Sequence, residues 1–311
     1  MITNSRPYRR LYHDGALSAR LTTSLELMKR CKLCPRECGI DRLSGETGFC
    51  RTGRRARIAS YHAHFGEEAP LVGRHGSGTI FISHCNLLCS FCQNFEISHL
   101  GEGREVKPEH LAAMMVQLQE EGCHNINFVT PTHVVPQIIE SLIIAVEQGL
   151  TIPLVYNSGG YDKVETLKLL DGIVDIYMPD FKFGNSSWAG EFCSAMDYFD
   201  VASAAITEMH RQVGDLEIGE DGIATRGLLV RHLVMPNGVA DTEKIMTFIA
   251  TEISPHTYVN VMDQYHPCGH AREDGRINRR ISPAEYTQAL GAARDAGLTR
   301  LDSPLRLFRW R

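Results

Sequence analysis

Six short, nearly continuous apolar runs alternate with helix-like segments from about residue 79 onward. The apolar runs cover residues 79–83, 125–129, 153–156, 174–178, 227–234 and 258–262. The helical patterns cover residues 107–121, 135–148, 163–170, 186–212, 241–251 and 283–296. Short apolar strands that alternate with helices are typical of a parallel sheet buried on both faces. The sequence therefore predicts an α/β fold.

Unusual polar residues follow each of these six runs. In parallel α/β folds the active site lies at the C-terminal ends of the strands. Cys85 follows the first run, and Asp180 and Lys182 follow the fourth. The loops after the other four runs are residues 130–133 (Thr-Pro-Thr-His), 157–160 (Asn-Ser-Gly-Gly), 235–238 (Met-Pro-Asn-Gly) and 263–266 (Asp-Gln-Tyr-His). Because all six loops fall at equivalent positions, we expect them to line one shared pocket.

Three cysteines, Cys85, Cys89 and Cys92, form a C-x3-C-x2-C triad directly after the first apolar run. Soft thiolate ligands select iron–sulfur clusters or zinc. Three thiolates on one short loop can hold three irons of a cubane [4Fe–4S] cluster, which leaves the fourth iron open for a substrate or cofactor. The alternative is a zinc knuckle that a distant ligand completes.

A second group of cysteines precedes the triad. Cys31, Cys34, Cys38 and Cys50 have the spacing C-x2-C-x3-C-x11-C, which predicts a metal site with a complete tetrahedral shell. Zinc would make this site a structural staple, and an iron–sulfur cluster would make it an electron relay. Free thiols without a metal are a third interpretation. We expect residues 1–75 to be an irregular N-terminal extension with this four-cysteine module and a helix near residues 17–29, and residues 76–311 to be the main body.

Composition indicates a water-soluble globular protein. Of the 311 residues, 43% are apolar and 22% charged. No apolar run approaches the length of about 20 residues needed to span a bilayer, and the N-terminus lacks the apolar core of a signal peptide. We therefore expect a cytoplasmic protein without a membrane partner. Ten cysteines in that compartment point to metal ligands or buried thiols rather than disulfides.

The charge is unevenly distributed. Residues 1–58 carry 13 Lys and Arg against five Asp and Glu, although the whole chain has a net charge of −5. A basic segment can meet a nucleic acid or an acidic partner. The segment shows no RNA-binding motif and no interleaved aromatic residues, so we expect it to complement the acidic body of the same chain. We predict no nucleic-acid partner.

Several stretches of the chain resemble one branch of the radical S-adenosylmethionine (SAM) superfamily, the PflX-type homologues of pyruvate formate-lyase activating enzyme. The matching stretches are the four-cysteine module, the triad followed by Gln-Asn, and residues 129–133, 156–161, 175–182, 231–236 and 262–266. Together they extend from about residue 31 to residue 300. The resemblance implies a partial (β/α)6 TIM-type barrel over residues 76–311, a [4Fe–4S] cluster on the triad and SAM bound at its fourth iron.

The reaction that this resemblance implies is reductive cleavage of SAM to a 5′-deoxyadenosyl radical, which abstracts hydrogen from a substrate. The substrate could be the glycine of a partner glycyl radical enzyme, or a small metabolite or peptide. A reductant such as flavodoxin or ferredoxin would supply the electron. A non-catalytic iron–sulfur or zinc protein that senses redox state is the alternative from another functional class.

The resemblance also suggests which residues bind SAM. Phe91 would pack near the adenine, although plain core packing explains it as well. Thr130 and Thr132 stand where the activating enzymes have a glycine-rich segment, so their carbonyls and hydroxyls would contact the amino group. Asn157 stands where those enzymes have an Asp, so one carboxylate is lost.

Further along the chain, Asp180 and Lys182 match an Asp-x-Lys pattern, and Lys182 could reach the SAM carboxylate. His266 aligns with a histidine near SAM. No catalytic residue can be assigned, but Tyr265 and Cys268 are candidates; Cys268 would serve as a hydrogen donor or second redox group, or it is an inert thiol. Other candidates on the substrate side are Tyr156, Arg231, His232, Asp263 and Gln264.

Overall fold

The computed structural model describes residues 6–302, and one ten-stranded, mostly parallel sheet runs through this part of the chain. The six predicted strands are all present and lie parallel to one another. Their order across the sheet is β9-β8-β6-β5-β4-β2. They are β2 (Ser77–Ile82), β4 (Ile126–Val129), β5 (Leu154–Ser158), β6 (Ile176–Pro179), β8 (Ala224–Leu233) and β9 (Tyr258–Met262). The prediction of an α/β fold with a parallel-rich sheet is therefore confirmed.

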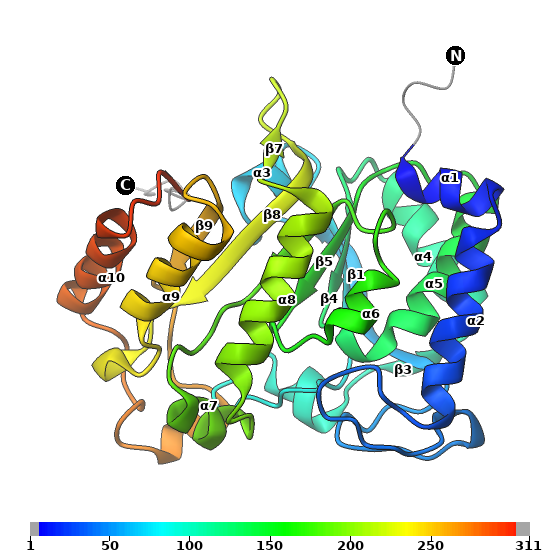
Figure 1. Ribbon diagram of the computed structural model, residues 1–311. Helices are drawn as coiled ribbons and strands as arrows, with labels where there is room; N and C mark the ends of the chain where they lie inside the picture. The colour runs from blue at the N-terminus through cyan, green and yellow to red at the C-terminus, as the bar shows by residue number, and fades with distance from the viewer. Residues whose placement is uncertain (1–5, 303–311) are drawn as a thin grey trace.

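Helices cover the outside of this sheet (Figure 1). The central strands β5 and β6 are buried along their whole length, as their continuous apolar pattern predicts. The covering helices are α4 (Pro108–Glu120), α5 (Val135–Glu147), α6 (Val164–Lys168), α8 (Tyr198–Val213), α9 (Thr242–Phe248) and α10 (Pro283–Asp295). The short strand β10 (Arg300–Leu301) extends the sheet beyond β9.

The segment expected to be irregular contains a strand of the same sheet. β1 (Ala56–His64) pairs antiparallel with β2 on one side and with β3 (Arg104–Val106) on the other. Only its first half alternates between buried and half-buried residues, and its second half carries two histidines, so it shows no continuous apolar run. The chain then passes through Glu67 and Glu68 into the short helix α3 (Ala69–Val72).

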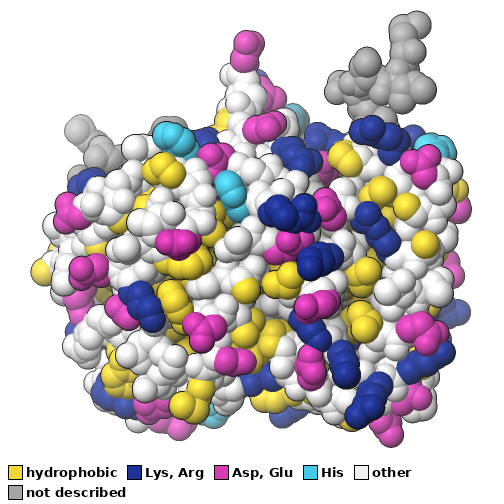
Figure 2. Space-filling view, viewed as in Figure 1, with side chains coloured by type: hydrophobic (Ala, Val, Ile, Leu, Met, Phe, Trp, Pro, Cys, Tyr) yellow, Lys and Arg dark blue, Asp and Glu magenta, His cyan; other side chains and the backbone are white. Residues whose placement is uncertain are grey.

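The pattern over residues 186–212 forms two helices rather than one. α7 (Ser186–Cys193) ends at Ser194, which adopts a left-handed φ of 50°, and α8 begins four residues later. The insert around residues 215–224 is a small hairpin, as predicted, in which β7 (Glu217–Ile218) pairs with the start of β8. This hairpin projects from the molecule, and Figure 2 shows acidic side chains on it.

The N-terminal segment packs along one side of the sheet. α1 (Pro7–His13) and α2 (Ala16–Lys29) lie beside α5, and the Tyr8 hydroxyl donates to the carbonyl of Ile152 at 3.0 Å. The four-cysteine loop follows α2 and lies at the same end of the molecule as α7 (Figure 1). In the described range no helix is both long and apolar enough to cross a membrane.

Candidate active site

The cysteine triad lies on the loop that follows β2. Cys89 is buried, Cys85 and Cys92 are half-buried, and all three are free thiols. The loop turns sharply twice, because His84 and Leu88 adopt left-handed φ values of 69° and 52°. Such values are uncommon for residues other than glycine. These two turns bring three cysteines within eight residues to one end of the sheet.

Hydrogen-bond donors point at two of the sulfurs. The N–H of Leu87 donates to Cys85 Sγ at 3.3 Å, and the Ser98 hydroxyl donates to Cys92 Sγ at 3.2 Å. Burial, and then the neighbouring cysteines, raises the pKa of Cys85 to about 12. A metal that binds here would therefore displace the protons, and these donors would stabilise the resulting thiolates.

The chemistry of the donor set fits an iron–sulfur cluster better than a single ion. Within residues 6–302, no group of three or more His, Cys, Asp or Glu side chains, in the triad or in the four-cysteine module, is arranged to hold one metal ion. A cubane cluster makes a different demand, because each cysteine binds a different iron. The triad contributes thiols only, which suits a soft metal and excludes calcium and magnesium as natural occupants.

A half-buried network of charged side chains lies at the C-terminal ends of β5, β6 and β8. Arg231 donates through Nε to Asp180 Oδ1 at 2.8 Å, through Nη2 to Asn157 Oδ1 at 2.6 Å and through Nη1 to Glu67 Oε2 at 3.2 Å. Lys182 Nζ contacts the other oxygen of Asp180 at 2.5 Å. One guanidinium therefore ties three neighbouring strands and the segment after β1 together.

The electrostatics of this network keep Asp180 ionised. Burial alone would raise the pKa of Asp180, but Arg231 and Lys182 outweigh it and hold that pKa below its usual value. Burial raises the pKa of Glu67 to about 7, although Arg231 opposes this shift. Sequence reasoning missed Glu67, because nothing in its local pattern indicates that it enters this network.

Lys182 also lies close to the triad loop. A Cβ placed on Gly159 would be 3.8 Å from Lys182 Cε and 3.3 Å from a methyl group of Leu87, so the three residues share one small space. Burial raises the pKa of Cys92, and the charge of Lys182 acts in the opposite direction. The structure thus brings together two of the predicted elements, the Asp-x-Lys pattern and the triad.

The predicted loop after β4 takes an unexpected partner. Thr132 donates to Asp162 Oδ1 at 2.7 Å, and the hydroxyls of Tyr156 and Ser158 donate to the same carboxylate at 2.8 and 2.6 Å. Asp162 is buried, which raises its pKa, and the three hydroxyls partly offset that shift. The side-chain hydroxyl of Thr132 is therefore occupied, whereas Thr130 has a left-handed φ of 63° at the turn.

Phe91 belongs to an aromatic cluster behind the triad. Its ring centroid lies 5.9 Å from that of Phe183, 6.4 Å from Phe192 and 6.3 Å from Tyr265. Tyr265 is buried, and its hydroxyl donates to the carbonyl of Ile277 at 2.8 Å. Packing within this aromatic cluster is sufficient to explain the positions of Phe91 and Tyr265. The Tyr265 hydroxyl already has a hydrogen-bond partner.

The loop after β9 packs onto the triad loop. The N–H of His270 donates to the carbonyl of Ser90 at 2.8 Å, which brings this loop against the triad loop. Cys268 and His266 are half-buried there, and His266 Nδ1 lies 3.3 Å from the carbonyl of Gln264. On the adjacent strand, His232 is fully buried and faces the carbonyl of Phe181.

The four-cysteine module is compact. Cys31, Cys34 and Cys50 are buried and Cys38 is half-buried. A Cβ at Gly48 would lie only 2.7 Å from Cys38 Sγ, so this position needs glycine. The four thiols lie close enough together to affect one another's ionisation: burial raises the pKa of Cys34 to about 12, and the other three cysteines add to that shift.

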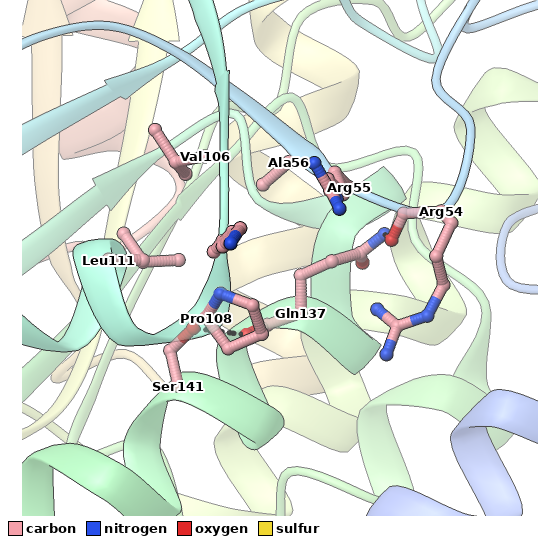
Figure 3. Close-up of a pocket in the computed structure, with 9 residues that line it drawn as sticks. Arg54, Arg55, Ala56, Val106, Pro108, Leu111, Gln137 and Ser141 are labelled. Atoms are coloured by element: carbon pink, nitrogen blue, oxygen red, sulfur yellow. Dashed lines mark hydrogen bonds between the residues drawn. The ribbon is translucent and has the colours of Figure 1, made fainter.

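A small pocket beside this module is not a cofactor site. It lies between β1, β3, α4 and α5, where Gln137 Nε2 donates to the Arg54 carbonyl at 2.9 Å (Figure 3). Its volume of about 10 Å³ suffices for a single water molecule at most. The buried Gln137 Oε1 has no hydrogen-bond partner among residues 6–302.

Comparison with known proteins places the chain in a family. No model of a known protein family matches it. It is 34% identical over 287 residues to the uncharacterized protein MJ0674 of Methanocaldococcus jannaschii. The aligned region covers 89% of this chain and 78% of MJ0674. The chain belongs to the MJ0674 family. A second uncharacterized protein of the same organism, MJ0808, is 26% identical over 258 residues and covers 76% of this chain and 71% of that protein.

Solved structures extend the comparison of the fold. The chain is similar to HydG, a maturase of the [FeFe]-hydrogenase, with a TM-score of 0.50, 13% identity and 72% of this chain covered. It spans half of HydG. A radical SAM methyltransferase from Sphaerobacter thermophilus gives a TM-score of 0.47 at 13% identity, covering 72% of this chain and 65% of that one. At this identity the likeness to HydG shows that this member of the MJ0674 family shares its fold.

Proposed function

We propose that this chain is a radical SAM enzyme in which Cys85, Cys89 and Cys92 hold a [4Fe–4S] cluster. The observation that carries the proposal is the position of the triad: three thiols on one loop at the end of a buried parallel strand, beside the Lys182–Asp180 pair. A zinc knuckle does not require this position, and a cofactor-binding site does. SAM would bind at the open fourth iron.

When bound, the reduced cluster and SAM together supply a 5′-deoxyadenosyl radical that abstracts hydrogen from the substrate. The residues of the chain would bind SAM and orient it. Lys182 offers its ammonium group to the SAM carboxylate, and Arg231 fixes Asp180, which in turn fixes Lys182. The aromatic residues around Phe91 keep water away from the triad.

The remaining SAM contacts are part of the same proposal. Phe91, Thr130, Thr132 and His266 lie on loops that would surround the cofactor, and Asn157 lies near the end of β5. The Thr132 and Asn157 side chains are partly engaged elsewhere. Their contacts to SAM would therefore come chiefly from backbone carbonyls at residues 130–132. The strands that carry them would form a partial (β/α)6 barrel over residues 76–311.

The four-cysteine module is proposed as a second metal centre, with zinc or an iron–sulfur cluster, in an N-terminal unit of residues 1–75. Four thiols complete a tetrahedral shell, so this centre has no position for substrate. The electron donor would be flavodoxin or ferredoxin in the cytoplasm. The substrate would be a glycyl radical enzyme, a peptide or a small metabolite.

The experiment is anaerobic reconstitution with iron and sulfide, reduction with dithionite, addition of SAM and quantification of 5′-deoxyadenosine by mass spectrometry. Wild-type protein should form it, and the Cys85/Cys89/Cys92→Ala variant should form none. Cys123→Ala is the matched control, because it removes a buried thiol outside the triad. A loaded cluster that does not bind SAM would contradict the proposal and leave a non-catalytic iron–sulfur protein as the function.

A further inference from the structure

Arg36 joins the four-cysteine module to the triad loop. It lies in the module between Cys34 and Cys38. Its Nε donates to the carbonyl of Asn86 at 2.9 Å, and its Nη2 donates to the carbonyl of Cys193 at 2.8 Å. Its Nη1 also contacts the carbonyl of Ser194. Three nitrogens of Arg36 therefore bond to carbonyls of residues that lie 50 and about 157 positions away in the sequence.

Two of the three acceptors of Arg36 lie next to the triad. Asn86 is the residue that follows Cys85. Cys193, at the end of α7, places its Sγ 3.2 Å from Cys89 Sγ. Arg36 therefore contacts the triad loop directly at Asn86 and, through Cys193, beside Cys89.

The guanidinium of Arg36 is itself fixed in place. It lies 4.0 Å from the ring centroid of Phe49, which precedes Cys50, and 5.0 Å from that of Tyr161. The Asn86 side-chain amide donates to the carbonyl of Tyr161 at 2.7 Å, so these two partners of Arg36 are also bonded to each other. Because Phe49 belongs to the module, the position of Arg36 depends on how the module is folded.

A second arginine of the module is linked through His133 to the chain just before the triad. Arg42 is only 1% exposed, and its guanidinium donates to the carbonyls of Gly53, at 2.9 and 3.2 Å, and His133, at 2.8 Å. His133 in turn donates from Nε2 to the carbonyl of Ser83, two residues before the triad. The Cys31 sulfur lies 4.0 Å from Arg42 Nη1.

Within the described residues Arg42 contacts carbonyl oxygens and this sulfur, without a carboxylate. A buried cation that lacks an anion is strongly disfavoured. Four thiolates carry more negative charge than an oxidised [4Fe–4S] core carries positive charge, so a module that holds such a cluster would be an anion beside Arg42. Metal in the module would thus stabilise Arg42 in its buried position.

We propose that the four-cysteine module is a metal-dependent clamp on the triad loop, in which the loaded module neutralises Arg42 and orders Arg36 against Asn86 and Cys193. The inference rests on the proposed function for its meaning, since the clamped loop is the one that would hold the cluster. Arg36 is a positioning residue, because it would act on the triad only through the backbone carbonyls of Asn86 and Cys193.

Amide hydrogen exchange tests the clamp in protein that holds no cluster on the triad. In the Cys85/Cys89/Cys92→Ala background, adding Arg36→Ala should speed amide exchange across residues 83–95 by about tenfold or more, because several charged hydrogen bonds are lost. Arg36→Lys keeps the positive charge but lacks the planar guanidinium with its several donors, so it should recover part of the protection from amide exchange. Lys32→Ala is the matched control, because it removes an exposed cation of the same module.

Metal removal tests the dependence on loading. Cys34→Ser/Cys50→Ser protein should carry no module metal by elemental analysis and should release triad iron to a chelator about tenfold faster than wild type, as should Arg36→Ala with its module metal intact. Unchanged exchange and unchanged iron release in the Arg36 variants would overturn the clamp, even if the double cysteine variant fails to fold. A wild-type triad that never binds iron would instead overturn the proposed function, and the exchange measurement would still decide the clamp.

Discussion

Two arginines, Arg231 and Arg42, show how differently the two cysteine regions are built. Arg231, at the strand ends near the triad, contacts the carboxylates of Asp180 and Glu67. Arg42, in the four-cysteine module, contacts carbonyls and a cysteine sulfur. The protein's carboxylates supply the counter-charge at the first site, whereas metal-bound thiolates would supply it at the second. The strand-end site is therefore preformed, and under our proposal the module depends on its metal.

The largest expected effect comes from breaking the preformed network. Arg231→Ala leaves Glu67 without a cation and leaves Asp180 with Lys182 alone, so we expect a loss of about 3–5 kcal/mol in the free energy of unfolding. Urea denaturation of the metal-free protein measures this loss. Arg211→Ala, which removes an exposed arginine with two carboxylate partners, should have a much smaller effect. Equal losses would contradict a preformed strand-end network.

Acid should weaken the same region through His232. Its Nδ1 donates to the carbonyl of Phe181 and its Nε2 accepts from Thr242, and burial lowers its pKa to about 4. The neutral form is thus favoured by folding, so its stabilisation is present above the unfolded pKa of about 6.5 and is lost as pH falls toward 4.

The His232→Gln variant measures that contribution. The free energy of unfolding of wild type should fall by up to about 3 kcal/mol more than that of the variant between pH 7 and pH 4. Urea titrations at several pH values give the two curves. Parallel curves would mean that His232 binds its proton equally well in the folded and unfolded states.

The module should respond to metal where the strand ends do not. Arg42→Met removes the cation that a loaded module needs, so we expect the variant to lose about 1–3 kcal/mol more stability with module metal bound than after its removal by a chelator. For Arg231→Ala the loss should be the same with and without that metal. An Arg42 effect that does not depend on metal would remove the contrast between the two arginines.

The smallest effect is expected at the rim of the site. Cys268 is half-buried on the loop after β9, and no hydrogen bond ties its sulfur to another described residue. Cys268→Ala should change the free energy of unfolding by less than about 0.5 kcal/mol. A larger loss would show that this loop belongs to the rigid strand-end network.

Local patterns predicted the parts of the fold that depend on local sequence. The continuous apolar runs located six parallel strands, and the position of Cys85 after the first run located the triad at their C-terminal end. β1 was missed because it is an antiparallel strand with histidines in its second half. The break at Ser194 was missed because nothing in the helical pattern of residues 186–212 marks a left-handed residue.

The connections between the two cysteine regions could not be predicted for a different reason. Arg36, Glu67 and Asp162 gain their roles from contacts with distant segments, such as the 2.9 Å bond from Arg36 to the carbonyl of Asn86. A lone arginine between cysteines has many equally ordinary interpretations in a sequence. Only the folded chain shows that its guanidinium meets the backbone beside two triad cysteines.

The most direct test of the central claim is an electron paramagnetic resonance spectrum of the reduced, reconstituted protein before and after addition of SAM. The Cys85/Cys89/Cys92→Ala variant provides the contribution of the module, which is subtracted. If the triad holds a cluster with an open iron, SAM becomes its new ligand, and the remaining signal should change shape. A triad signal that SAM leaves unchanged, or no triad signal at all, would contradict the claim.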